Sequence, residues 1–136
     1  TVVHPTAGAV AVGARLPLIA FNRLLDTADV AVARRVARAV RESSGGLAAV
    51  QALGLFLPRR RTSQVSMNLL DYRRTSIIEV VRAVSDAARQ DGSRVVAAEL
   101  VGLAPSAALE GLDQGVLPGL PDQSRSIESR LAACAG

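Results

Sequence analysis

The chain has 136 residues and a mass of 14.1 kDa, which is enough for one domain with a sizeable core and too little for two full-sized domains. Its hydrophobic fraction of 49% and charged fraction of 21% exclude wholesale disorder and collagen-like or low-complexity classes. All sixteen basic residues are arginine and give a net charge of +4, a surplus that suits carboxylate or phosphate partners but that genomic base composition alone also explains.

Residue types that carry most metal and nucleophile chemistry are scarce. The chain has one cysteine, Cys134, and one histidine, His4, which leaves no internal disulfide, no Cys/His metal cluster and no histidine triad. Its apolar stretches are interrupted well before the roughly 18 residues of a membrane helix, and its first residues do not form a signal peptide. We therefore expect a cytoplasmic protein without bound metal or membrane attachment, whose N-terminus looks cut from a longer chain.

The first half of the chain reads as strand, helix, strand. The short apolar run 16–25 favours a buried central strand over a helix. Residues 28–42 place apolar side chains on one helical face and arginines on the other, which predicts an amphipathic helix. A Ser-Ser-Gly-Gly stop follows, and the apolar stretch 47–57 is interpreted as a strand because Gly54 argues against a helix there.

The second half reads as strand, helix, strand again. Residues 64–69 show the clearest period-two alternation in the chain, which predicts a strand with two different faces. Ser76 and Glu79 have the spacing of a capping box, and an apolar stripe then predicts a helix that ends at the Asp-Gly pair 91–92. Residues 94–101 form another strand-like run. The stripe comprises Ile77, Val80, Val81, Val84 and Ala88.

This order of elements is that of the ferredoxin-like split βαβ (βαββαβ) arrangement, an α+β sandwich of two layers. Two helices cover one face of the sheet in such a domain, and the other face stays open for function. We expect residues 1–110 to form this domain. Residues 111–136 would add a linker punctuated by Pro and Gly, 111–121, and a closing helix, 122–134, that packs back on the same domain.

In the third predicted strand, polar side chains alternate with apolar ones. The polar set is Gln64, Ser66 and Asn68, and the apolar set is Val65, Met67 and Leu69. If the apolar set faces the helices, hydroxyl and amide groups line the open face. Such uncharged groups can hold a heterocycle or a peptide group without the desolvation cost of ions. A merely solvated antiparallel face would show the same alternation.

Three further residues could belong to a site on that face. Asn22 interrupts an otherwise apolar strand, so its amide needs partners from protein, water or ligand. Glu99 lies in the apolar run of the last strand, where a carboxylate needs an arginine or another donor, and Arg15 is a possible partner. A structural Asn and a structural salt bridge are the alternatives. Strand parity opposes placing Arg15 and Asn22 on one face.

Four short motifs carry a resemblance to a known family. They are GAR at 13–15, LIAFN at 18–22, QVSMN at 64–68 and ELVGLAP at 99–105. In this order they resemble the C-terminal subdomain of glutamate formimidoyltransferase, the formiminotransferase part of formimidoyltransferase-cyclodeaminase. The likeness runs from about residue 4 to about residue 109, and the closing helix resembles the family less specifically.

The resemblance implies a transferase that moves a formimino group from N-formiminoglutamate to N5 of tetrahydrofolate, its co-substrate, in histidine degradation. It also implies a folate site in a cleft between this subdomain and a similar first half. We expect Gln64, Ser66 and Asn68 to meet the donors and acceptors of the pterin. Arg15, Asn22 and Glu99 are the other expected contacts to folate or substrate.

The family's catalytic histidine belongs to the first half, and His4 does not match it. The resemblance therefore implies that this chain supplies no catalytic residue and has no transferase activity by itself. Its partners would be folate, formiminoglutamate and the missing N-terminal subdomain, and the uncovered surface could drive homodimerisation.

Two other classes of function share this order of elements. An RNA-binding module would use it, but such modules stack bases on aromatic side chains, and the third strand offers none. We therefore expect no nucleic-acid partner. A small-molecule regulatory or assembly domain without catalysis remains the alternative.

Overall fold

The structure, a computed structural model, describes residues 2–112 and 119–135. Within them, four strands form one antiparallel sheet in the order β2-β3-β1-β4. The strands are β1 (Ile19–Leu25), β2 (Val50–Leu57), β3 (Thr62–Leu69) and β4 (Val95–Val101). β1 is thus a central strand, as the sequence predicted, although it begins three residues later than expected and β2 likewise begins after the start of the predicted run.

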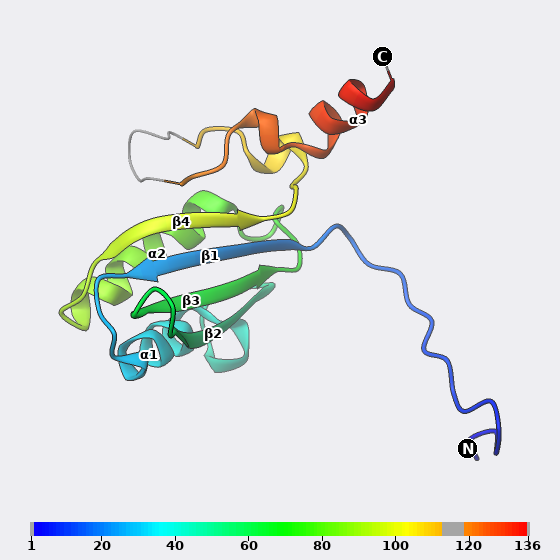
Figure 1. Cartoon of the computed structure of the whole chain (residues 1–136), viewed down its shortest axis with the longest axis horizontal. Coiled ribbons are helices and arrows are strands. Elements are labelled where there is room, and N and C mark those ends of the chain that lie inside the picture. The colour runs from blue at the N-terminus through cyan, green and yellow to red at the C-terminus, as the bar shows by residue number, and fades with distance from the viewer. Residues whose placement is uncertain (1, 113–118, 136) are drawn as a thin grey trace.

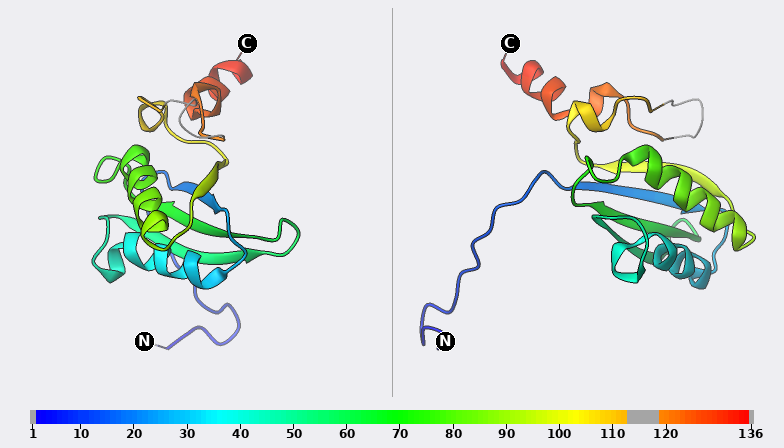
Figure 2. Two further views of the ribbon diagram at one scale, coloured as in Figure 1. Left: turned by 90° about the vertical axis from the view of Figure 1, so that its left-hand side faces the viewer. Right: turned by 180° about the vertical axis from the view of Figure 1, so that it is seen from behind.

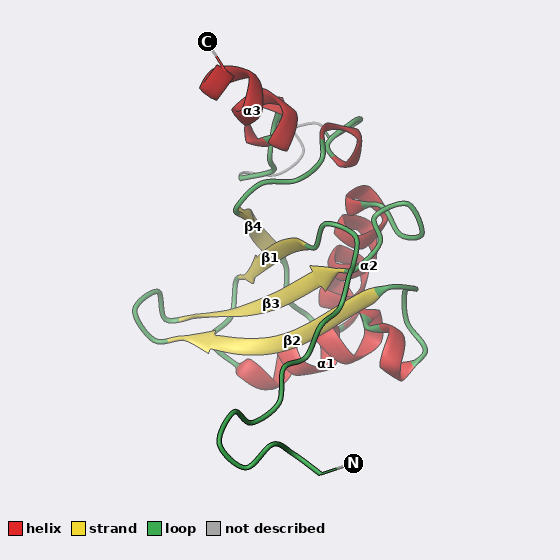
Figure 3. Cartoon of the chain, turned by 90° about the vertical axis from the view of Figure 1, so that its right-hand side faces the viewer, coloured by secondary structure: helices red, strands yellow, loops and turns green. Residues whose placement is uncertain are grey.

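Two helices, α1 (Val30–Val40) and α2 (Ile77–Gln90), pack against the same face of the sheet (Figures 1 and 2). The other face carries no helix in the described part of the chain (Figure 3). The protein is therefore α+β, and its strand order and pairings are consistent with the predicted ferredoxin-like split arrangement.

The two packed helices match their predicted faces, with a difference at the ends of α1. In α2, Ser76 and Glu79 form the predicted capping box, and every residue of the predicted apolar stripe is buried. α1 begins only at Val30, because the Asp29 carboxylate caps it by accepting a hydrogen bond from the Ala31 amide at 2.8 Å. It ends at Val40, because the backbone of Arg41 is already extended.

The core lies between the sheet and these helices. The apolar side chains of β3 that were predicted to face the helices are all buried, and Ile19, Phe21 and Leu25 of β1 are fully buried beside them. β2 approaches α1 so closely that a Cβ atom on Gly54 would lie 2.6 Å from the Arg34 Cα. Gly54 thus permits the contact between helix and strand.

One charged residue, Arg23, lies in this core. Its side chain is 1% exposed and donates a hydrogen bond from a terminal nitrogen to the Ser85 hydroxyl of α2 at 3.0 Å. Its Nε and other terminal nitrogen have no partner in the described part of the chain. Burial lowers the pKa of Arg23 to about 10.

The C-terminal segment differs from expectation. Asp122 does not cap a long helix; its carboxylate caps a short turn, Gln123–Arg125, and the helix α3 (Ile127–Ala135) follows. Arg125 ties this segment to the end of β4 by donating to the backbone carbonyls of Leu100 and Gly102 at 3.0 and 2.8 Å.

The helix α3 itself stands away from the sheet (Figure 1) and has no buried residue. Its first turn is tied to the segment after β4, where the Ile127 amide donates to the Ala104 carbonyl at 2.9 Å and the Glu128 carboxylate accepts from the Ser106 amide at 2.8 Å. Its Cys134 is exposed. The predicted linker lies partly outside the described residues. Across the ranges that are described, no helix has the length and apolar character needed to cross a membrane.

Candidate functional site

The open face of the sheet brings together three of the predicted residues from three different strands. Asn22 of β1 pairs in register with Ser66 of β3 on one side and with Glu99 of β4 on the other. The Asn22 side-chain amide donates a hydrogen bond to the Glu99 carboxylate at 3.3 Å. We call Asn22, Ser66 and Glu99 the central row. It presents a hydroxyl, an amide and a carboxylate side by side.

The other two predicted residues of β3 flank the central row. Gln64 pairs with Leu24, and Asn68 pairs with Ala20. Alternation along β3 therefore places all three polar side chains on the face away from the helices, as predicted from the sequence. Gln64 is only 6% exposed and Asn22 only 9%, so these amides are largely withdrawn from water and need defined partners.

Arg15 is the one predicted residue that the structure does not bring to this face. It is exposed in the segment before β1, which runs away from the sheet (Figure 1). Because β1 begins at Ile19, strand parity does not apply to Arg15. Within the described residues, Glu99 bonds with Asn22 and not with Arg15.

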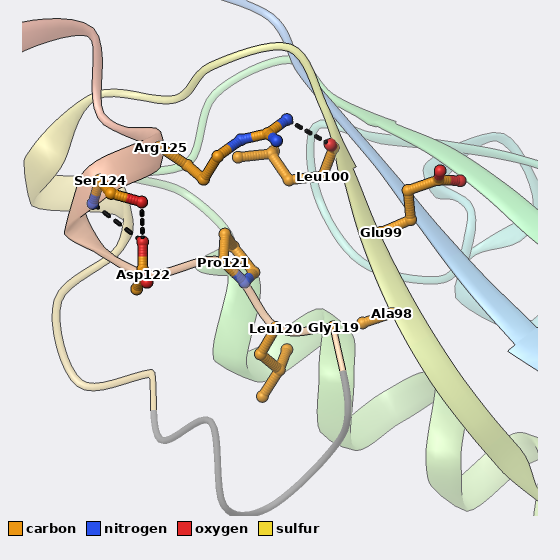
Figure 4. A pocket seen from close by; sticks show the side chains of 9 residues that line it. All are labelled: Ala98, Glu99, Leu100, Gly119, Leu120, Pro121, Asp122, Ser124 and Arg125. Carbon is orange, nitrogen blue, oxygen red and sulfur yellow. Dashed lines mark hydrogen bonds between the residues drawn. The ribbon is translucent and has the colours of Figure 1, made fainter. Parts of the chain in front are cut away.

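A hollow of about 320 Å³ lies beside β4, where the segment 119–125 runs along the strand (Figure 4). Arg125 lines it, but its guanidinium is engaged with the Leu100 carbonyl, and the Glu99 side chain points away from Asp122 and Leu120. This hollow is mainly the joint between the sheet and the C-terminal segment, and it adds little to the central row.

A second hollow, of about 300 Å³, lies over β2 and β3 and includes two of the predicted residues. Sequence reasoning missed its remaining residues, because the turn after α1 was interpreted only as a helix stop. We call it the β2–β3 hollow. It is lined by Arg41, Ser43, Gln51, Ala52, Leu53, Ser66, Met67 and Asn68.

Apolar side chains border these polar groups on the edge strand. Leu53 and Leu55 of β2 are 62% and 41% exposed, and Leu53 pairs in register with Ser66. The open face is thus apolar along one edge and polar through its centre. Exposed leucines on an edge strand are a common feature of surfaces that contact another protein segment.

The groups needed for a metal site do not gather here. Across the described residues, the structure contains no cluster of three His, Cys, Asp or Glu side chains that could hold a metal ion. His4 lies in the N-terminal segment, where its Nδ1 accepts a hydrogen bond from the Ala7 amide at 3.1 Å. What the open face offers is hydrogen bonding, a carboxylate and a nearby guanidinium.

Comparison with known proteins places most of the chain in one family. Residues 20–114 match the family described as Formiminotransferase domain. The chain is 42% identical over 107 residues to the glutamate formimidoyltransferase of Streptococcus pyogenes serotype M1, which covers 79% of this chain and 36% of that relative. The glutamate formimidoyltransferase of Thermoplasma acidophilum is 41% identical over 103 residues, which covers 76% of this chain and 34% of that relative.

The formimidoyltransferase-cyclodeaminase of Sus scrofa is 39% identical over 112 residues, which covers 77% of this chain and 20% of the relative. The chain thus spans about a third of the length of the matched glutamate formimidoyltransferases. The matched segment contains the central row and both packed helices, while Arg15 lies before it. The resemblance drawn from the four motifs is confirmed, and the chain belongs to the formiminotransferase domain family.

Proposed function

We propose that this chain is the folate-binding part of a glutamate formimidoyltransferase, with the open face of its sheet as the folate surface. The complete enzyme would transfer a formimino group from N-formiminoglutamate to N5 of tetrahydrofolate. Membership of the family supports the reaction class, and the central row within the matched segment supports the place of binding.

The chemistry of the central row suits a pterin. A pterin edge carries N–H donors next to ring nitrogen and carbonyl acceptors. The Glu99 carboxylate can accept from two adjacent N–H groups, and the hydrogen bond from Asn22 holds that carboxylate in place. The hydroxyl of Ser66 and the amide of Gln64 can serve the remaining donors and acceptors. Since most of these groups are uncharged, a ligand would desolvate them at modest cost.

We further propose that the reaction needs the segment that the longer relatives possess and this chain does not span. The matched relatives are about three times as long as the aligned region. A covering segment would exclude water from the open face and bring its own catalytic groups to the bound folate. The exposed Leu53 and Leu55 are suited to contact it.

RNA binding finds no support on this surface. Among the described residues, the open face carries no aromatic side chain: Phe21 is buried under the helices, and Phe56 has the same parity along β2 as the buried Val50 and Ala52. Base stacking, on which such modules depend, would therefore lack its platform.

The experiment is a calorimetric titration of the 136-residue chain with folinic acid, a stable tetrahydrofolate derivative. We expect binding, and we expect Glu99→Gln to weaken it by roughly tenfold, the value of one charged hydrogen bond. Glu110→Gln, a change at an exposed loop carboxylate, serves as the matched control. Absence of binding to the unmodified chain would refute the proposed function, and equal effects of both variants would remove Glu99 from the site.

A further inference from the structure

We propose that the β2–β3 hollow is a carboxylate-binding subsite, with Arg41 as its anchor, that receives a glutamyl carboxylate. This inference rests on the proposed function and deepens it, because folate and N-formiminoglutamate both carry such a group. Neither the family match nor the names of the relatives assign a role to Arg41 or to this hollow.

The first observation is the way Arg41 is held. It follows α1 directly, its backbone amide donates to the Ala37 carbonyl, and its Nε donates to the Ser44 hydroxyl at 2.7 Å. This hydrogen bond fixes the guanidinium at one side only. In the described ranges, the two terminal nitrogens of Arg41 have no protein partner, so the fork that matches a carboxylate is available.

The second observation concerns the neighbouring acidic residue. Glu42 would be the nearest carboxylate along the chain, but it faces Arg74, with 3.7 Å between the Glu42 carboxylate and a terminal nitrogen of Arg74. No ion pair of Arg41 is present among the described residues. The hollow therefore keeps an uncompensated positive charge, which attracts an anion.

The turn that carries Arg41 and Ser43 is held rigidly against α1. A Cβ atom on Gly46 would lie 2.6 Å from the Val40 carbonyl oxygen, so only glycine permits this close return of the chain. The Gly46 amide donates to the Arg41 carbonyl at 3.0 Å. A subsite on a fixed turn loses less entropy on binding than one on a loose loop.

The hollow is also continuous with the central row. Its lining includes Ser66, which belongs to that row, and Gln51 and Asn68, which pair with each other across β2 and β3. Adjacent strands lie about 4.8 Å apart, so β2 lies roughly 10 Å from Asn22 on β1. A ligand whose ring system contacts the central row could therefore place a carboxylate toward Arg41.

The test compares Arg41→Gln with Arg38→Gln, a matched change at an exposed arginine in the last turn of α1. Three probes are titrated against the 136-residue chain: folinic acid, 5-formyltetrahydropteroate, which lacks the glutamate, and N-formylglutamate. Circular dichroism melts verify that each variant is folded. Arg41→Lys, which keeps the charge but not the fork, shows whether two-point contact matters.

We expect Arg41→Gln to weaken the binding of folinic acid at least tenfold and Arg38→Gln to change it less than twofold. The affinity for the glutamate-free probe should be the same in both variants as in the unmodified chain. An effect on N-formylglutamate alone would still uphold the subsite and assign it to the amino-acid substrate. The proposal is overturned if Arg41→Gln and Arg38→Gln change the affinities for folinic acid and N-formylglutamate by the same factors. It is also overturned if Arg41→Gln weakens the binding of the glutamate-free probe as much as that of folinic acid. If folinic acid does not bind the unmodified chain but N-formylglutamate binds through Arg41, the folate function is refuted and the subsite is upheld. If neither probe binds, the folate function and the subsite are both refuted.

Discussion

The buried Arg23 allows a sharp prediction about stability, because burial of its charge and its hydrogen bond to Ser85 affect the folded state in opposite directions. Burial lowers its pKa to about 10, and the difference from the ordinary value of an arginine corresponds to a penalty of about 3 kcal/mol on the charged form. The hydrogen bond to Ser85 offsets about 1–2 kcal/mol of it. Replacing the side chain with an uncharged one of similar length should therefore stabilise the fold by about 1–2 kcal/mol.

The perturbation is Arg23→Met, measured by urea unfolding at pH 7. The chain has no tryptophan, so far-ultraviolet circular dichroism is the appropriate signal. Arg82→Met, at an exposed position of α2, should change the free energy of unfolding by less than about 0.5 kcal/mol. Ser85→Ala should destabilise the unmodified chain but have almost no effect in the Arg23→Met background, which makes a double-mutant cycle.

The pH dependence has a defined sign. Arg23 is charged in both states at neutral pH, so the penalty is complete there. Above about pH 10 the folded state releases the Arg23 proton before the unfolded state does, so the unfolded state binds more protons and the stability of the unmodified chain should rise relative to Arg23→Met. A destabilised Arg23→Met variant would refute the reasoning, since the hydrogen bonding of the guanidinium would then outweigh its desolvation.

Three further predictions concern other contacts. Gly54→Ala should destabilise the fold by about 2 kcal/mol or more in urea unfolding, because the added Cβ would press on the α1 backbone at Arg34. Gly13→Ala, which has open space around the added Cβ, should not change the free energy of unfolding. Equal effects of the two substitutions would contradict the close packing at Gly54. Asp26 accepts hydrogen bonds from the Arg94 amide and the Ser93 hydroxyl at 2.8 and 2.7 Å. Chiefly the bond from the Arg94 amide lowers the pKa of Asp26 to about 2. Asp26→Asn should therefore lower the free energy of unfolding by roughly 1–2 kcal/mol at pH 7. That difference should be present above pH 3.8 and disappear as the pH falls toward 2; a difference that persists in acid would contradict it. Sedimentation of the chain at several concentrations should show self-association that Leu53→Ser reduces, because Leu53 is an exposed apolar residue on an edge strand; a concentration-independent monomer would exclude the dimer.

Features set by local periodicity were predictable from the sequence. The capping box at Ser76 and the apolar stripe of α2 depend on spacings of three and four residues, and the alternation in β3 depends on a spacing of two, so each could be read from a short window. The same alternation correctly placed Gln64, Ser66 and Asn68 on the face of the sheet away from the helices.

Features that depend on distant partners were not predictable in this way. The pairing of Asn22 with Glu99 joins residues on different strands, and nothing local distinguishes it from a pairing of Glu99 with Arg15. The hollow around Arg41 needs a turn, two strands and their register together. The position of α3 likewise depends on distant residues, because Ile127 and Glu128 bond to Ala104 and Ser106 and no residue of the helix is buried against the sheet.

The central strand shows how the core determines the site. Along β1, Asn22 lies on the open face and its neighbour Arg23 lies under the helices, so a slip of one residue would exchange them. The fully buried Ile19, Phe21 and Leu25 oppose that slip, because it would turn all of them toward the open face. The central row therefore owes its alignment to apolar residues on the opposite face of the strand. It follows that substitutions such as Phe21→Ala should weaken folate binding as well as stability, whereas Arg23→Met, which leaves the three apolar anchors intact, should raise stability and leave folinic acid affinity unchanged.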